Sequence, residues 1–309
     1  MAVTRIPAEL ALPCTVHQTE LGEGARWDAR RSELLRVDIV AGVVFRDRVT
    51  ADGGLEPLAV HEVAPTVGAV APIEGDDGWV LASGRGFVHL RPDGTSRTIA
   101  EVAPPRTRMN DAACDPQGRF WAGTVGEHQE PGASTLYRLD PDGHVEAILE
   151  GLHISNGIGW SPDGETLYLA DSGAKKVHAF RFDPARGTIS EGRALTLLPE
   201  EAGAPDGLTV DAAGHIWVAV YGGGCVHRYA PDGTLLEIHE VPAEQSTSCA
   251  FGGPGLDWLY VTTATERWTD DDRRAEPGAG VVYRLRVGTV GVPAAPFRPD
   301  PAWWSTVSA

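Results

Sequence analysis

The sequence predicts an all-β fold, a six-bladed β-propeller, and three observations support this prediction. A pattern of a turn, a short apolar strand, a small-residue break and a second strand recurs along the 309 residues. In its clearest copies the turn glycines Gly118, Gly164 and Gly214 are 46 and 50 residues apart, which matches four-stranded propeller blades. No segment of ten or more residues shows the 3.6-residue apolar period of a helix.

Six copies of this pattern follow one another along the chain, two weaker ones first and four clearer ones after them. They lie at residues 27–37, 74–82, 115–123, 161–170, 211–219 and 253–261. The chain length divided by the repeat length gives about six. Residues 1–309 are therefore expected to form one domain, since all-β domains of this size are common.

The remaining segments are assigned to turns and surface structure. Three Pro-Asp-Gly sequences, at residues 92–94, 141–143 and 231–233, each follow an apolar run and predict hairpin turns between outer strands. The acidic run Asp270–Asp272 is expected to be a solvated loop. Trp303 and Trp304, in a Pro-rich terminal stretch, are expected to pack on the edge of a blade.

The composition excludes several classes of partner. With 43 acidic and 26 basic residues the formal net charge is −17, which repels nucleic acids and anionic membranes. No apolar run is long enough to cross a membrane, and the four cysteines form no metal-binding or redox motif. We therefore expect a cytoplasmic protein with reduced thiols. The oligomeric state is left open; nothing indicates an obligate interface, so the sequence is compatible with a monomer.

Polar residues recur where the innermost strand of several blades is expected to begin. These residues, just before the innermost strands, are Glu23, the pair Asn110 and Asp111, Asn156 and Asp206. In a propeller the first strand of each blade lines the central channel, so these side chains are expected to converge. Carboxylates and an amide oxygen suit a divalent cation. Taken singly, each Asn-Gly or Asp-Gly pair would be an ordinary turn, but their repeated position favours a site.

Five ordered motifs carry a family resemblance. The chain resembles the senescence-marker-protein, gluconolactonase and regucalcin-like family over nearly its full length. The matching motifs are Leu21-Gly-Glu-Gly-x-x-Trp27, Arg108-x-Asn-Asp111 with the segment 115–124, the segment 154–163, the segment 205–211 and Thr247-Ser-x-x-Phe-Gly-Gly253.

The resemblance implies a six-bladed propeller that hydrolyses a small sugar lactone, such as gluconolactone. It implies that Glu23, Asn156 and Asp206 bind one divalent metal cation and that Asp206 acts as acid and base. It also implies substrate contacts from Arg108 and Asn110. Ca²⁺, Mg²⁺, Mn²⁺, Zn²⁺ and Fe²⁺ all accept such ligands, so the ion is left open.

The sequence departs from the family pattern at two places. Ala25 stands where the family usually has proline after Glu-Gly. Family members often place a substrate-binding glutamate one residue after the position of Glu127, and His128 stands there. Both Glu127 and His128 are therefore candidates for substrate binding, and the particular lactone is left open.

Three other functions agree with the same residues. The scaffold could hydrolyse a related ester or phosphotriester, because the same metal would polarise those oxygens. It could act on a specialised metabolite. It could also be a non-catalytic calcium-binding propeller, since a fold alone does not determine function.

Overall fold

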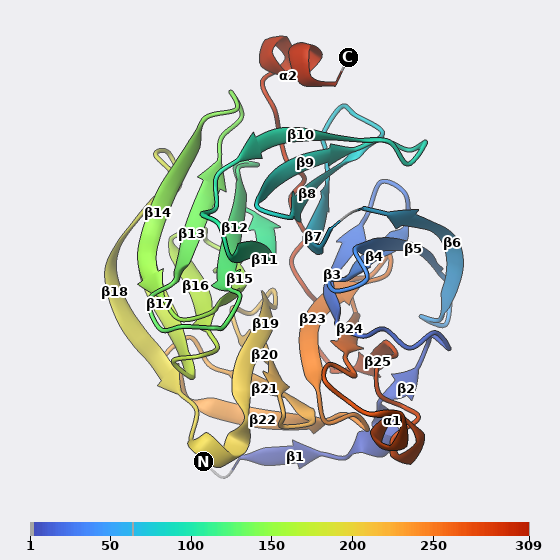
Figure 1. Cartoon of the computed structure of the whole chain (residues 1–309). Coiled ribbons are helices and arrows are strands. Elements are labelled where there is room, and N and C mark those ends of the chain that lie inside the picture. The colour runs from blue at the N-terminus through green and yellow to red at the C-terminus, as the bar shows by residue number, and fades with distance from the viewer. Residues whose placement is uncertain (1–2, 64, 309) are drawn as a thin grey trace.

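The computed structural model describes residues 3–63 and 65–308. Six sheets, five of them wholly antiparallel, are arranged as blades around a central axis, so the prediction of a six-bladed β-propeller is confirmed (Figure 1). Within each sheet the strands follow one another from the axis to the rim. Neighbouring sheets bury apolar side chains between them; Trp121 of the third sheet, for example, makes an edge-on contact with Trp160 of the fourth.

Four of the sheets consist of four consecutive strands each. The first contains β3 (Gly22–Asp28), β4 (Glu33–Asp38), β5 (Val43–Val49) and β6 (Leu55–Glu62). The second contains β7 (Val67–Pro72), β8 (Trp79–Ser83), β9 (Gly86–Leu90) and β10 (Ser96–Glu101). The third contains β11 (Thr107–Cys114), β12 (Phe120–Gly126), β13 (Ser134–Leu139) and β14 (Val145–Leu152). The fourth contains β15 (Ser155–Trp160), β16 (Thr166–Asp171), β17 (Lys176–Asp183) and β18 (Thr188–Leu197).

The last two sheets also include strands from the beginning of the chain. The fifth contains β19 (Ala204–Val210), β20 (Ile216–Tyr221), β21 (Cys225–Tyr229), β22 (Leu235–Glu240) and, parallel to β22, β1 (Thr4–Ile6). The sixth contains β23 (Ser246–Gly252), β24 (Trp258–Thr263), β25 (Tyr283–Arg286) and β2 (Leu12–Pro13). Because β2 pairs with β25, the two ends of the chain together close the ring.

The predicted repeat corresponds to the connection between the first and second strands of each blade. Every aligned copy begins near the end of a first strand and runs into the second. In the third blade, Asp115 accepts hydrogen bonds from the N–H groups of Gln117 and Arg119, and Gly118 has a φ of 90°. The same carboxylate accepts a hydrogen bond from Trp121 Nε1 on the second strand. The repeat is therefore a turn that also holds a core tryptophan.

After β25 the chain crosses one end of the central channel. The N–H of Gly291 donates to Leu256, that of Phe297 donates to Pro72, and that of Asp300 donates to Pro141. This segment thus runs from the sixth blade to the second and third, as the red trace in the middle of Figure 1 shows. It closes the channel at the end where the turns between first and second strands lie.

The two terminal tryptophans pack as predicted. Trp304 is buried beside Phe297, and its Nε1 donates to Asp76 on the second blade. The ring of Trp303 lies against Gly143 in a hairpin turn of the third blade. The three predicted Pro-Asp-Gly turns, including the one with Gly143, do join third and fourth strands.

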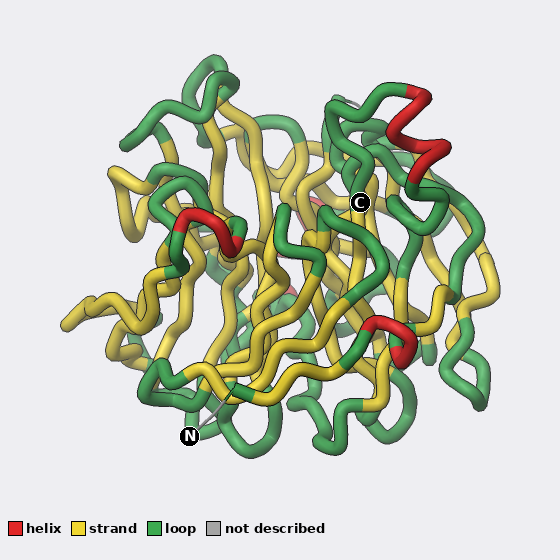
Figure 2. The backbone as a smooth tube through the Cα atoms, turned by 90° about the horizontal axis from the view of Figure 1, so that it is seen from below, coloured by secondary structure: helices red, strands yellow, loops and turns green. Residues whose placement is uncertain are grey.

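The helices are short and lie among the connections outside the sheets (Figure 2). They are the α-helices α1 (Asp270–Ala275) and α2 (Pro301–Val307) and the 3₁₀ turns η1 (Ala8–Leu10) and η2 (Glu200–Ala202). The prediction of a loop at residues 270–272 is wrong, because Thr269 and Asp272 form a capping box that starts α1. None of the helices in the described part of the chain is long and apolar enough to span a membrane.

Candidate metal centre

The first strand of every blade has a register shift near its N-terminal end. The shifts lie at residues 23–26, 67–69, 109–112, 155–158, 205–208 and 246–248. An extra residue in one strand redirects its side chain away from the regular pleat. Four of these bulges carry the predicted polar residues Glu23, Asn110, Asn156 and Asp206. The sequence prediction placed these residues just before the first strands; they lie within the strands instead.

Glycines at the bulges allow neighbouring first strands to approach closely. A Cβ atom on Gly68 would lie 2.2 Å from the carbonyl oxygen of Asn110 in the next blade. A Cβ atom on Gly207 would lie 2.2 Å from Ser248 Oγ in the blade after it. Real Cβ atoms do not make contacts this short, so only glycine fits at these positions. The ring of first strands is therefore tighter than it would be with any other residue there.

Glu23 and Asp206 are buried acids that act on each other. The exposed fraction of each residue is 5%. Burial raises the pKa of Glu23 well above its usual value, and the charges of Asp206 and Asp111 raise it further. Burial likewise raises the pKa of Asp206, with further contributions from Asp111 and Glu266. A divalent cation among these groups would compensate their negative charge.

Two buried oxygens of the predicted ligands have no hydrogen-bond donor among the described residues. They are Asn156 Oδ1 and Asp206 Oδ1. Buried acceptors are normally paired, so these two atoms call for a partner that the chain does not supply. Within residues 3–63 and 65–308 no group of three or more His, Cys, Asp and Glu side chains is arranged to hold a metal ion. The unpaired amide oxygen of Asn156 fits a cation ligand beside the carboxylate of Asp206.

Arg108 lies in the same site and is held in place by Asn110. Arg108 Nη1 donates to Asn110 Oδ1 at 2.7 Å and to the carbonyl oxygen of Met109 at 3.1 Å. Asn110 Nδ2 in turn donates to the carbonyl oxygen of Ser155 in the next blade at 3.0 Å. Burial lowers the pKa of Arg108, and the charges of Glu266, Glu23 and Asp206 oppose that shift. The structure thus brings the five predicted residues of the channel into one electrostatic neighbourhood.

Glu127 and His128 lie on an exposed turn after β12. Glu127 Oε2 accepts a hydrogen bond from Arg106 Nε at 3.1 Å, and Arg106 Nη2 contacts His128 Nε2. Among the described hydrogen bonds and ion pairs, neither side chain contacts a predicted residue of the channel. Both lie at the end of the β11–β12 hairpin where Arg108 is found. Their predicted contact with substrate stays a prediction.

Four more residues lie near the site, and of these the sequence singled out only Asp111, as the polar neighbour of Asn110. Burial raises the pKa of Asp111 to about 6, and this carboxylate also raises the pKa values of Glu23 and Asp206. Glu266 accepts a hydrogen bond from the hydroxyl of Tyr221 at 3.2 Å. The fourth is Ser172, which bonds Asn156. Except for Asp111, these residues lie at or just after the end of a second strand, so reading that position in each blade would have found them.

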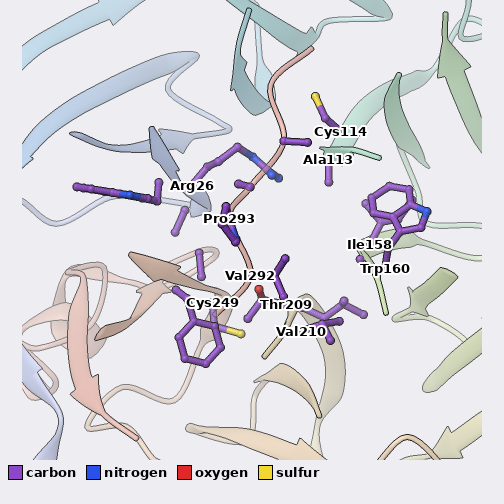
Figure 3. A pocket seen from close by; sticks show the side chains of 18 of the residues that line it. Arg26, Ala113, Cys114, Ile158, Trp160, Thr209, Val210, Cys249, Val292 and Pro293 are labelled. Carbon is purple, nitrogen blue, oxygen red and sulfur yellow. The ribbon is translucent and has the colours of Figure 1, made fainter. Parts of the chain in front are cut away.

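A separate cavity of about 210 Å³ lies farther along the same first strands. Figure 3 shows the terminal segment, with Val292 and Pro293, crossing it between Arg26, Trp160 and Cys249. Gly24 and Asp111 also line this cavity. The terminal segment covers this end of the channel, and Glu127 and Ser172 lie at the opposite end.

Comparisons with known proteins agree with this geometry. Residues 21–265 match the family model described as SMP-30/Gluconolactonase/LRE-like region. The chain is 39% identical over 287 residues to pentonolactonase XacC of Haloferax volcanii, covering 91% of this chain and 94% of that protein. It is 35% identical over 301 residues to regucalcin of Xenopus laevis, covering 94% of this chain and 99% of that protein.

A solved structure is similar along almost the whole chain. It is a calcium-binding protein, regucalcin, from Agrobacterium tumefaciens, with a TM-score of 0.89 and 30% sequence identity. The match covers 96% of this chain and 100% of that one. The predicted family resemblance is thereby confirmed. The family model covers the first strands of all six blades and the bulges that carry the polar residues, and the chain belongs to the SMP-30/gluconolactonase/LRE-like family.

Proposed function

We propose that this protein is a metal-dependent lactonase that hydrolyses a small sugar lactone, an aldonolactone such as gluconolactone, to the hydroxy acid. The observation that carries the proposal is the pair of buried, unpaired oxygens on Asn156 and Asp206, beside the carboxylate of Glu23. The similarity to a protein named pentonolactonase supports a lactone as substrate.

Glu23, Asn156 and Asp206 would hold one divalent cation, and the ion is Ca²⁺, Mg²⁺, Mn²⁺, Zn²⁺ or Fe²⁺. When bound, the cation would polarise the lactone carbonyl and lower the pKa of a water molecule. The carboxylates suit each of these ions, and the amide oxygen adds a neutral ligand. The name of the similar calcium-binding structure supports a divalent ion.

Asp206 would move the proton. Because Oδ1 is the proposed metal ligand, the other carboxylate oxygen would accept a proton from the water that attacks the carbonyl carbon. As the new C–O bond forms and the ring C–O bond breaks, the same oxygen returns the proton to the departing ring oxygen. Burial of the carboxylate keeps bulk water away from this transfer.

Arg108 and Asn110 would orient the sugar. Arg108 makes both of its described hydrogen bonds through Nη1, which leaves Nε and Nη2 for oxygens of the substrate. Asn110 fixes that orientation through its Oδ1 and keeps a second N–H for a hydroxyl. Glu127 and His128 would contact the part of the lactone nearest to the solvent.

A cytoplasmic location, a single domain over residues 1–309 and a monomeric state complete the proposal. Cys14, Cys114, Cys225 and Cys249 are free thiols, as expected in a reducing compartment. The expected partner is the small lactone, with no nucleic acid and no membrane.

A second candidate function is calcium binding without catalysis, because a similar structure is named a calcium-binding protein. The same residues would bind the ion, and no substrate would be turned over. Titration with metal does not separate the two functions, whereas a turnover assay does.

The test is a pH-stat assay of pentono- and hexono-lactones with chelator-treated protein, to which one divalent metal is restored at a time. We expect turnover only after metal is added, and no turnover by Asp206→Ala at any metal concentration. Metal binding without turnover of any lactone would favour the second candidate. Full activity of Asp206→Ala would overturn the proposed mechanism.

A further inference from the structure

The hydroxyl of Ser172 bonds one proposed metal ligand in the fourth blade and, in the fifth blade, the residue that precedes another. Ser172 follows β16 in the fourth blade and has an exposed fraction of 9%. Its Oγ accepts a hydrogen bond from Asn156 Nδ2 at 3.1 Å. It also donates to the carbonyl oxygen of Pro205 in the fifth blade at 2.7 Å. Pro205 directly precedes Asp206.

The direction of these two bonds follows from the groups themselves. A serine hydroxyl has one proton, and a backbone carbonyl can only accept. Because the Ser172 proton is used by Pro205, Ser172 Oγ can only accept from Asn156. Asn156 must therefore turn its NH₂ group toward Ser172. The two ends of an asparagine amide have nearly the same shape, so such a bond is what decides their orientation.

This orientation determines what Asn156 offers to the site. With Nδ2 bonded to Ser172, Oδ1 points the other way and has no donor among the described residues. The flipped amide would place a donor where Oδ1 now lies, in the position where a cation needs an acceptor. It would also set an acceptor against Ser172, which has no second proton to give.

The bond to Pro205 adds a second constraint. Proline has no N–H. The beginning of β19 therefore has one backbone donor fewer for hydrogen bonds between strands than the beginning of the other first strands. The Ser172 hydroxyl instead fixes the carbonyl of Pro205 and thereby the backbone that leads to Asp206. One buried hydroxyl thus fixes an oxygen of the fourth blade relative to a carboxylate of the fifth.

We propose that Ser172 is a positioning residue. It keeps the amide oxygen of Asn156 turned toward the cation and fixes the position of that oxygen relative to Asp206. The inference rests on the proposed function, in which one ion binds both unpaired oxygens, Asn156 Oδ1 and Asp206 Oδ1. Ser172 itself touches neither the cation nor the substrate. Residues that orient metal ligands typically change metal affinity by about 10–100-fold when they are replaced.

The experiment compares three variants with the wild-type protein. Ser172→Ala removes the hydroxyl, and Ser172→Thr keeps it. Ser134→Ala is the matched control, because Ser134 is a buried serine that donates to the backbone carbonyl of His153 at 2.8 Å and bonds no predicted ligand. Calorimetric titration of chelator-treated protein with Ca²⁺ and with Mn²⁺ measures the dissociation constant of each.

We expect Ser172→Ala to weaken cation binding about 10–100-fold, Ser172→Thr to restore most of the affinity, and Ser134→Ala to leave it unchanged. At saturating cation the kcat of Ser172→Ala should return toward the wild-type value, which a general loss of folding would not allow. Wild-type affinity in Ser172→Ala would overturn this inference alone. If the wild-type protein bound no cation, the proposed function would fail together with it.

Discussion

Gly157 in the fourth blade packs against the backbone of Asp206 in the fifth. A Cβ atom on Gly157 would lie 2.4 Å from the carbonyl oxygen of Asp206 and 2.5 Å from the N–H nitrogen of Leu208. These contacts are with backbone atoms, which cannot move aside as the end of a side chain can. Gly157, the residue next to the proposed ligand Asn156, thus sets the distance between two strands that supply proposed ligands.

Replacing Gly157 by Ala should therefore separate the two strands. We expect a loss of about 1–3 kcal/mol in the free energy of unfolding and weaker cation binding. Chemical denaturation and calorimetric titration measure the two effects. Gly159→Ala is the matched control on the same strand, because its Cβ would first meet the flexible end of Leu208. Equal cation affinity in both variants would contradict this explanation.

Stability of the metal-free protein should depend on pH in the direction that the buried acids dictate. Burial raises the pKa values of Glu23 and Asp206 above their unfolded values, and that of Asp111 to about 6. The protonated, neutral form of these acids is the one that the folded protein favours. Their contribution to stability is complete below about pH 4, the region of their pKa values in the unfolded chain, and is lost as the pH rises through their pKa values in the folded protein. The metal-free melting temperature should therefore fall, relative to the metal-bound one, from about pH 5 to pH 8.

The difference between the two melting curves is the quantity to measure, since buried histidines outside the site affect both forms equally. Glu23→Gln provides the control. It removes one buried charge, so the metal-free variant should be more stable than the metal-free wild type above pH 7 and should bind cation weakly. A melting-temperature difference that stays constant with pH would argue against buried acids at this site.

Arg108→Lys should impair substrate binding more than folding. Lysine keeps the charge but cannot bond Asn110 and a substrate oxygen through a planar fork. We expect kcat/KM to fall about 10–100-fold, as for the loss of one charged hydrogen bond. Arg181→Lys, at an exposed ion pair on an outer strand, is the control and should leave kcat/KM unchanged. Equal kcat/KM values for Arg108→Lys and Arg181→Lys would show that Arg108 does not bind the substrate.

The terminal segment should contribute to stability through Trp304. Its side chain is buried against Phe297 and His89, and its Nε1 bonds Asp76. Trp304→Ala should lower the free energy of unfolding by about 3–5 kcal/mol, the usual cost for a buried tryptophan. Trp303→Ala, at a less buried position, should cost less than half of that. A negligible loss in Trp304→Ala would show that the segment is not part of the folded core.

The sequence was sufficient to predict the blades because each blade is a local unit. Turn residues such as Asp115 and Gly118 form hydrogen bonds with residues a few positions away. Their spacing in the sequence therefore indicates directly where the strands of a blade begin and end. The polar residues of the first strands were also predictable, because ring symmetry brings equivalent positions together. What symmetry could not show is the bulge that turns each of these side chains.

Contacts between blades are the part that the sequence could not provide. Ser172 bonds residues 16 and 33 positions away, and nothing in its own motif indicates either partner. The path of residues 288–300 was likewise unpredictable, because a Pro-rich stretch without apolar periodicity has no preferred neighbour. The helix α1 is different: its Thr269 and Asp272 were a readable signal of a helix start.

The most direct measurement is anomalous diffraction from crystals of the protein grown with Mn²⁺. The account predicts one Mn²⁺ peak per chain, at about 2.0–2.6 Å from an oxygen of each of Glu23, Asn156 and Asp206. If ordered crystals with Mn²⁺ bound elsewhere showed these three oxygens too far apart to share an ion, the proposed metal centre and the hydrolysis built on it would both be wrong.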